Sequence, residues 1–183
     1  MITVQICEAT QEDPLKYICF KDSKGKLIRE SYYDQDNNLI LDDMNEFSES
    51  KGTSQFVLFI GNNYEAIAYR DVFHTDANQR SDKRSGCTDY KSINGEFKKI
   101  SWMIYKPSSK EKPFSKGLYY NQNDEMLYYC INDDTTFTTT YFSPDDQVIA
   151  DFYEFHEKHV ALVETYDTIK SELLRQARDK YRY

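Results

Sequence analysis

Short apolar stretches separated by clusters of turn-forming residues dominate the first 142 residues. The segment Ile2–Ile6 alternates apolar and polar side chains, which is the period-2 pattern of a half-buried strand. The segment Gln55–Ile60 is almost wholly apolar, and Gly61–Asn63 after it supplies residues that tolerate the positive φ of a hairpin turn. This alternation of short apolar stretches and turns predicts an antiparallel β-meander over residues 1–142.

Three nine-residue segments share one order of residue types. Each has two aromatic residues, then a polar turn, then two aliphatic residues or Met: Tyr32–Ile40, Tyr119–Leu127 and Tyr141–Ile149. A β-hairpin whose aromatic strand packs across from its aliphatic strand would explain this order. A composition rich in Tyr, Asp and Asn would also produce such matches by itself, so both interpretations stay open.

The segment Tyr32–Ile40 resembles the YD-type hairpins of Rhs toxin proteins and the MORN-like hairpin repeats of some bacterial antitoxins. The resemblance covers about nine residues per copy. The turn glycine of those families is present in the looser segment Asp22–Leu27. The resemblance implies repeated antiparallel hairpins and points to a bacterial toxin or antitoxin context.

The third copy also carries the start signal of a helix. Ser143 is a good N-cap residue, Pro144 suits the first helical position, and the two acids after it favour the positive end of the helix dipole. Apolar residues then recur at spacings of four and three, and no Gly or Pro follows. We therefore expect a single domain, residues 1–183, of α+β class: an antiparallel β-meander sheet (1–142) packed with a long C-terminal α-helix (143–183). Residues 148–155 could instead complete a third hairpin, leaving a helix that begins near His156.

Composition and charge bound the functional classes. The chain has 183 residues, enough for one core, and 31 acidic against 23 basic residues give a net charge of −8. Direct binding to nucleic acid or to an anionic membrane is disfavoured, because such binding is driven by a basic surface. The sequence contains no run of about 20 apolar residues and no leader-like start, so we expect a cytoplasmic protein.

Candidate catalytic or metal-binding motifs are weak. The four cysteines are dispersed and predict reduced, mostly buried thiols rather than a zinc site or disulfides. His156 and His159 are three residues apart, whereas the zincin motif needs two histidines four apart. His74 is interpreted as a solvated loop histidine. We expect no catalytic residue, no metal and no cofactor, with an unrecognised enzyme using His74 or the His156 and His159 pair as an alternative.

Acidic and aromatic residues are interleaved over residues 118–154, a stretch without any Lys or Arg. A solvated acidic face over an aromatic core is one explanation. The other is a docking surface on which tyrosines supply contact area and carboxylates pair with a cationic protein. The candidate partner-binding residues are Asp124, Glu125, Tyr128, Asp133, Asp134, Asp145 and Asp146.

A small, acidic, tyrosine-rich chain without catalytic signals resembles the immunity proteins encoded beside bacterial polymorphic toxins. That resemblance implies a non-enzymatic protein that neutralises a cognate basic toxin by binding across its active site. It involves neither direct nucleic-acid contact nor a membrane, and the long helix could pair two copies into a homodimer. The alternative from another class is a phage-encoded inhibitor whose carboxylates mimic the charge of DNA phosphates.

Overall fold

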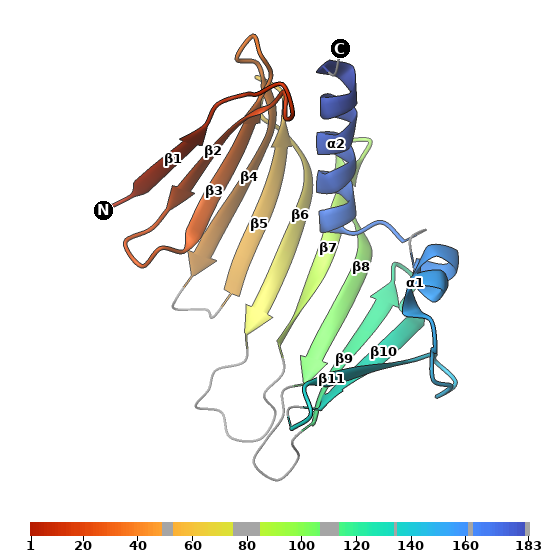
Figure 1. The fold of residues 1–183 in the computed structure, drawn as a ribbon. Coiled ribbons are helices and arrows are strands. Elements are labelled where there is room, and N and C mark those ends of the chain that lie inside the picture. Colours follow the sequence, from red (N-terminus) through yellow and green to blue (C-terminus); the bar gives the residue numbers. More distant parts are fainter. Residues whose placement is uncertain (49–52, 75–84, 107–113, 134, 161–162, 182–183) are drawn as a thin grey trace.

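The computed structural model describes residues 1–48, 53–74, 85–106, 114–133, 135–160 and 163–181 (Figure 1). Its main element is one antiparallel sheet of eleven strands. The strands are β1 (Thr3–Cys7), β2 (Lys16–Lys21), β3 (Leu27–Tyr33), β4 (Leu39–Ser48), β5 (Thr53–Ile60), β6 (Glu65–His74), β7 (Ser85–Ile93), β8 (Glu96–Lys106), β9 (Phe114–Asn121), β10 (Met126–Asp133) and β11 (Thr138–Phe142). The helical elements are α1 (Phe152–Phe155), a single π-helical turn η1 (His156–Val160) and α2 (Tyr166–Tyr181).

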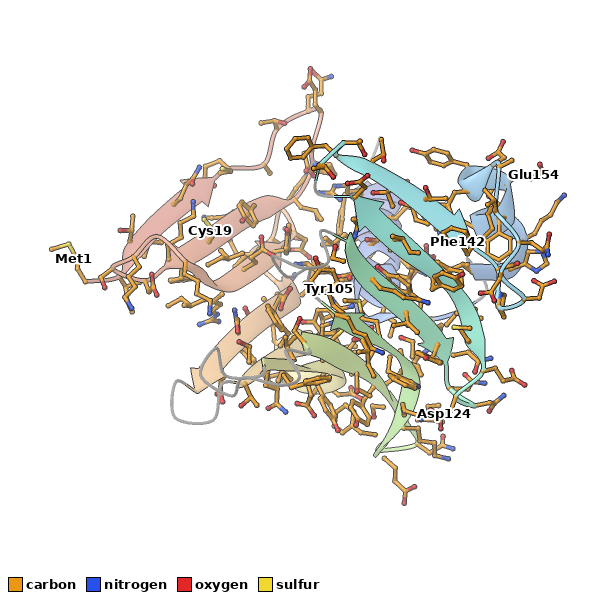
Figure 2. The ribbon with its side chains drawn as sticks, turned by 90° about the horizontal axis from the view of Figure 1, so that it is seen from below. Met1, Cys19, Tyr105, Asp124, Phe142 and Glu154 are labelled. Carbon is orange, nitrogen blue, oxygen red and sulfur yellow. The ribbon has the colours of Figure 1, made fainter. Side chains whose placement is uncertain are left out.

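Every strand pairs with its neighbours in the chain, so the sheet order follows the sequence from β1 to β11. This arrangement confirms the expected antiparallel sheet followed by a C-terminal helix. Seen from below, the sheet bends, and α2 lies inside the bend (Figure 2). The helical elements therefore pack against the concave face, and this face carries the buried side chains discussed below.

Four turns share one backbone geometry. In each, the first residue donates its N–H to the carbonyl of the fifth, and the fourth donates its N–H to the carbonyl of the first. The fourth residue has a positive φ, which makes this a type I turn followed by a left-handed residue. The first and fourth residues are Asp22 and Gly25 (φ 78°), Asp34 and Asn37 (61°), Asn121 and Asp124 (65°), and Ser143 and Asp146 (65°).

The repeated sequence pattern therefore corresponds to a repeated hairpin turn. The side chain of the first residue explains why Asp or Asn stands there in three of the four turns. Asp34 Oδ1, for example, accepts hydrogen bonds from the N–H groups of Asp36 (2.9 Å) and Asn38 (2.8 Å). These bonds hold the turn closed from inside.

The continuous helix predicted over residues 143–183 is wrong. Ser143 begins the fourth of these turns, and Phe142 then forms an isolated bridge with Val148. A hairpin turn forms here instead of a helix, because Asp146 adopts the left-handed conformation, which a right-handed helix cannot accommodate. A helix starts only after Asp151, whose Oδ1 accepts the N–H of Glu154 at 3.0 Å. The alternative of a third hairpin was the better one for this segment.

The apolar core lies between α2 and the concave face. Leu41, Leu58 and Ala68 on three adjacent strands are fully buried. They form one cluster with residues of α2: Tyr166, Ile169, Leu174 and Ala177. Thr165, the residue before α2, exchanges hydrogen bonds with Thr168 and so caps the start of the helix.

Candidate functional site

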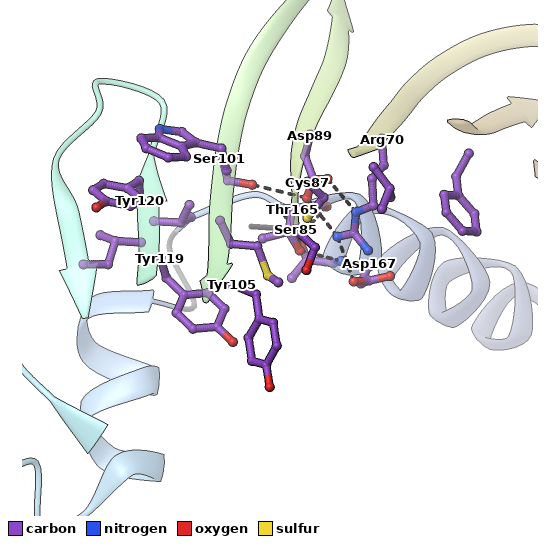
Figure 3. A pocket seen from close by; sticks show the side chains of 18 of the residues that line it. Arg70, Ser85, Cys87, Asp89, Ser101, Tyr105, Tyr119, Tyr120, Thr165 and Asp167 are labelled. Atoms are coloured by element: carbon purple, nitrogen blue, oxygen red, sulfur yellow. Dashed lines mark hydrogen bonds and ion pairs between the residues drawn. The ribbon is translucent and has the colours of Figure 1, made fainter. Parts of the chain in front are cut away.

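A cavity of about 730 Å³ opens on the concave face between α1 and α2 (Figure 3). Its floor is formed by strands β4 to β10, and its rim by η1, residues 163–165 and the start of α2. The volume falls within the range typical of small-molecule sites.

Aromatic and aliphatic side chains supply most of the wall. Tyr119 and Tyr128 stack with ring centroids 4.3 Å apart and planes 13° apart. Burial raises the pKa of Tyr119 to about 12, so its hydroxyl stays protonated at neutral pH. Met103 on β8 and Val72 on β6 complete the apolar floor.

An ion-pair cluster stands at the α2 end of the cavity. Arg70 on β6 contacts Asp89 on β7 through two hydrogen bonds, of 2.6 and 2.9 Å, and contacts Asp167 on α2 at 2.9 Å. Asp89 is only 2% exposed and also accepts the backbone N–H of Tyr166 at 2.9 Å and the hydroxyl of Ser101 at 3.3 Å. Burial works against the charge of Arg70, but its contacts with Asp89 outweigh that effect and raise its pKa.

The polar contacts continue along α2. The Tyr166 hydroxyl donates to Asp43 at 2.6 Å, and Lys170 reaches both Asp43 (2.6 Å) and Glu30 (2.5 Å). At the far end of the helix, the Tyr181 hydroxyl donates to Asp34 at 2.9 Å. These bonds fix the register of the helix on the sheet.

The groups that line the cavity do not form a recognisable catalytic set. Cys87 is the thiol in the wall, and burial raises its pKa to about 11, which keeps it protonated and weakly nucleophilic. His156 lines the cavity from η1, whereas His159 lies beside the ring of Phe155. His74 ends β6, and its side chain lies outside the described part of the chain. Within the described ranges, no group of three His, Cys, Asp or Glu residues could hold a metal ion.

The structure brings four of the predicted partner-binding residues to one end of the sheet. Asp124 and Glu125 lie in the turn before β10, and Asp145 and Asp146 lie in the turn after β11. Because Tyr129 near the start of β10 pairs with the last residue of β11, both turns lie at the same end of these strands. We call these four carboxylates the acidic end.

The remaining predicted residues lie elsewhere. Tyr128 is 8% exposed and faces the cavity rather than a partner surface. Asp133 is the last residue of β10, at the opposite end of that strand, where its Oδ1 accepts the N–H of Thr135 at 2.8 Å. Asp134 lies outside the described residues.

Sequence reasoning missed the cavity and its ion-pair cluster. Arg70, Asp89 and Asp167 come from three distant parts of the chain, and no motif joins them. The available signal was an Asp or Arg at an inward position of a central strand, such as Asp89 in β7. That signal becomes visible only once the strand register is known.

Comparisons with known proteins leave the chain unassigned. No family model matches it, and no curated protein matches it. It is similar to a solved structure from Bacteroides fragilis NCTC 9343, described as a protein with unknown function, with 12% sequence identity and a TM-score of 0.40. The match covers 79% of this chain and 99% of that chain. None of the helices in the described ranges is long and apolar enough to cross a membrane.

Proposed function

We propose that the protein is a non-enzymatic binding protein that captures a basic partner at the acidic end, in the manner of a bacterial immunity protein that occludes a toxin. The observation that carries this proposal is the scarcity of ion pairs at that end among the described residues. Among the described residues, Asp124 alone of its four carboxylates forms an ion pair, with Lys99. Glu125 and Asp146 instead accept hydrogen bonds from neutral groups, the Asn121 amide and the Tyr129 hydroxyl. Three carboxylates therefore keep their negative charge available to a partner.

The contrast with three buried acidic residues of the sheet supports the proposal. Asp42, Asp43 and Asp89 are buried and are each matched to Arg or Lys within the protein. Their role is structural. The unmatched negative charge is exposed at the turns around β10, where a cationic protein could approach without displacing any internal cation except Lys99.

The test begins by identifying the partner in cells to which the gene is native. The tagged protein is captured after crosslinking, and the dominant partner is then purified and its association rate is measured. The proposal expects a basic protein whose activity is blocked at a one-to-one ratio. A partner that binds DNA, and that releases it on binding this protein, would favour the DNA-mimic alternative.

The matched variants are Asp145→Lys and Asp36→Lys, because both residues occupy the third position of the same type of turn. Asp145→Lys should slow association roughly tenfold and weaken its salt dependence, because exposed charges act mainly on the association rate. Asp36→Lys, on the turn between β3 and β4, should leave association unchanged. Equal association rates for both variants would assign the acidic end to solubility and remove the basis of the proposal.

A further inference from the structure

The cavity exists because the two helical regions cover different parts of the concave face. The longer helix, α2, packs on β4, β6 and β7, and α1 packs its rings on β10 and β11. Cys87, Met103 and Tyr119, on strands β7 to β9, line the cavity. Val160 and Val163, described residues between α1 and α2, line the same space of about 730 Å³.

The body of the cavity favours an apolar ring. Val160 at the end of η1 and Val163 before α2 line the cavity together with Val72 and Met103 of the sheet. The stacked rings of Tyr119 and Tyr128 end this apolar wall on the α1 side. Aromatic walls of this kind bind flat or alicyclic rings through stacking and edge contacts.

The charges that line the cavity cancel. They are the cations Lys26 and Arg70 and the anions Asp89 and Asp167. Arg70 binds both anions, and Asp89 is further occupied by Ser101 and the Tyr166 N–H. A charged ligand would enter this environment without a matching charge and would lose its hydration, which is costly.

Two polar atoms in the wall have no hydrogen-bond partner among the described residues. Within the described part of the chain, Asn45 Oδ1 is buried and accepts no hydrogen bond. The Tyr105 hydroxyl also has no hydrogen-bond partner among the described residues, and Figure 3 shows this ring beside Tyr119 at the edge of the cavity. A buried acceptor without a donor is costly, so a hydroxyl or N–H group on a ligand would be favoured there.

We propose that this cavity is the binding site of an uncharged small molecule that has an aromatic or alicyclic ring and at least one hydroxyl or N–H donor. The ring lies between Met103 and the stacked tyrosines, and the donor reaches the Tyr105 hydroxyl, which lies beside Tyr119 at the edge of the cavity. This site is separate from the acidic end, so its test is independent of the test for capture of a basic protein.

The test uses three indole compounds that differ mainly in the charge of the side arm: tryptophol, tryptamine and indole-3-acetate. Calorimetry and ligand-observed NMR on the full chain measure their dissociation constants at pH 7. We expect tryptophol to bind with a dissociation constant below about 1 mM, and both charged compounds to bind at least about tenfold more weakly. Failure of tryptophol to bind, or equal binding of the three compounds, would overturn the proposal.

Variants then place the bound ligand. Met103→Trp fills the floor and should abolish tryptophol binding, whereas Ile104→Trp, on the opposite face of the same strand, should leave it unchanged. Val163→Trp narrows the cavity from the segment before α2 and serves if Met103→Trp does not fold. Tryptophol that binds the cavity-filling variants as tightly as the original chain sits elsewhere, and the assignment to this cavity fails.

Discussion

The two helical regions on the concave face hold to the sheet in different ways. The longer helix, α2, buries aliphatic and small residues, such as Ile169 and Ala177, and adds directional bonds from Tyr166, Lys170 and Tyr181 to carboxylates of the sheet. The shorter region, α1 with η1, has no fully buried residue. It is held by rings, with Phe152 stacked on Tyr141 at 3.8 Å between centroids.

The difference explains why one part of the concave face is covered by a helix while another part forms a cavity. Aliphatic packing with ion pairs at several points fixes α2 on β4, β6 and β7. Ring contacts at one end hold α1 but do not extend inward, so the floor between the two regions stays uncovered. The cavity is thus a consequence of the break in the C-terminal helix.

Among the variants that test this comparison, we expect Arg70→Ala to have the largest effect on stability. Removal of the guanidinium leaves Asp89 buried without its cation, which should lower the free energy of unfolding by about 3–5 kcal/mol. Urea denaturation at pH 7 measures the change. The double variant Arg70→Ala with Asp89→Asn should recover part of the loss, and a double variant no more stable than Arg70→Ala would contradict the role of the buried charge.

A direct comparison of the two regions pairs Leu174→Ala with Phe155→Ala. Leu174 is buried in the core under α2, and its truncation should cost about 3 kcal/mol. Phe155 is half-buried and contacts Tyr128 edge-on, so its truncation should cost less, about 2 kcal/mol, despite the larger side chain. The same denaturation experiment ranks them, and a larger loss for Phe155→Ala would show that α1 is the tighter of the two attachments.

Much of the fold could be predicted from the sequence because its signals are local. Period-2 alternation and polar turns are local signals, and they located the meander and the repeated hairpin of Tyr32–Ile40. The start of the C-terminal helix was not accessible. Ser143 suits both an N-cap and the first position of the hairpin turn, and the bridge between Phe142 and Val148 decides between them only in three dimensions.

The candidate site was less accessible than the fold. Clustering of acidic residues near β10 follows from their closeness in sequence, so the stretch was visible before the structure was known. The separation of Asp133 from Asp145 depends on strand direction. The inward orientation of Tyr128 depends on the strand register. The ion pair between Arg70 and Asp89 depends on it too, because these residues lie opposite each other on adjacent strands.

Acid should loosen the attachment of α2 before that of α1. Burial acts to raise the pKa of Asp34, but hydrogen bonds from Asn38, Tyr181 and the Asp36 N–H outweigh it and lower that pKa below its ordinary value. Asp34 therefore contributes stability above its unfolded pKa, about 3.9, and this contribution is lost as pH falls toward the folded pKa.

Hydrogen exchange measured at pH 6 and at about pH 3 checks this expectation. Protection of the last turns of α2 should fall more than protection of α1. Asp34→Asn should flatten the pH dependence of unfolding by about 1 kcal/mol, whereas Asp36→Asn, exposed in the same turn, should not. An unchanged pH dependence in Asp34→Asn would show that its bond to Tyr181 does not anchor the helix.

The smallest effect compares one turn type in the two regions. Asn37, below the end of α2, and Asp146, beside α1, both occupy the left-handed position, which Asn and Asp tolerate better than Ala. Asn37→Ala should cost about 0.5–1 kcal/mol through backbone conformation alone. Asp146→Ala should cost about 1 kcal/mol more, because it also removes the acceptor of the Tyr129 hydroxyl at 2.7 Å.

Glycine variants separate the backbone contribution from the hydrogen bond. Asn37→Gly should keep full stability, whereas Asp146→Gly should still lose the contribution of the hydrogen bond to Tyr129. If Asp146→Gly is as stable as the original chain, the hydrogen bond to Tyr129 contributes nothing, and the turn beside α1 is held by its backbone in the same way as the turn below α2.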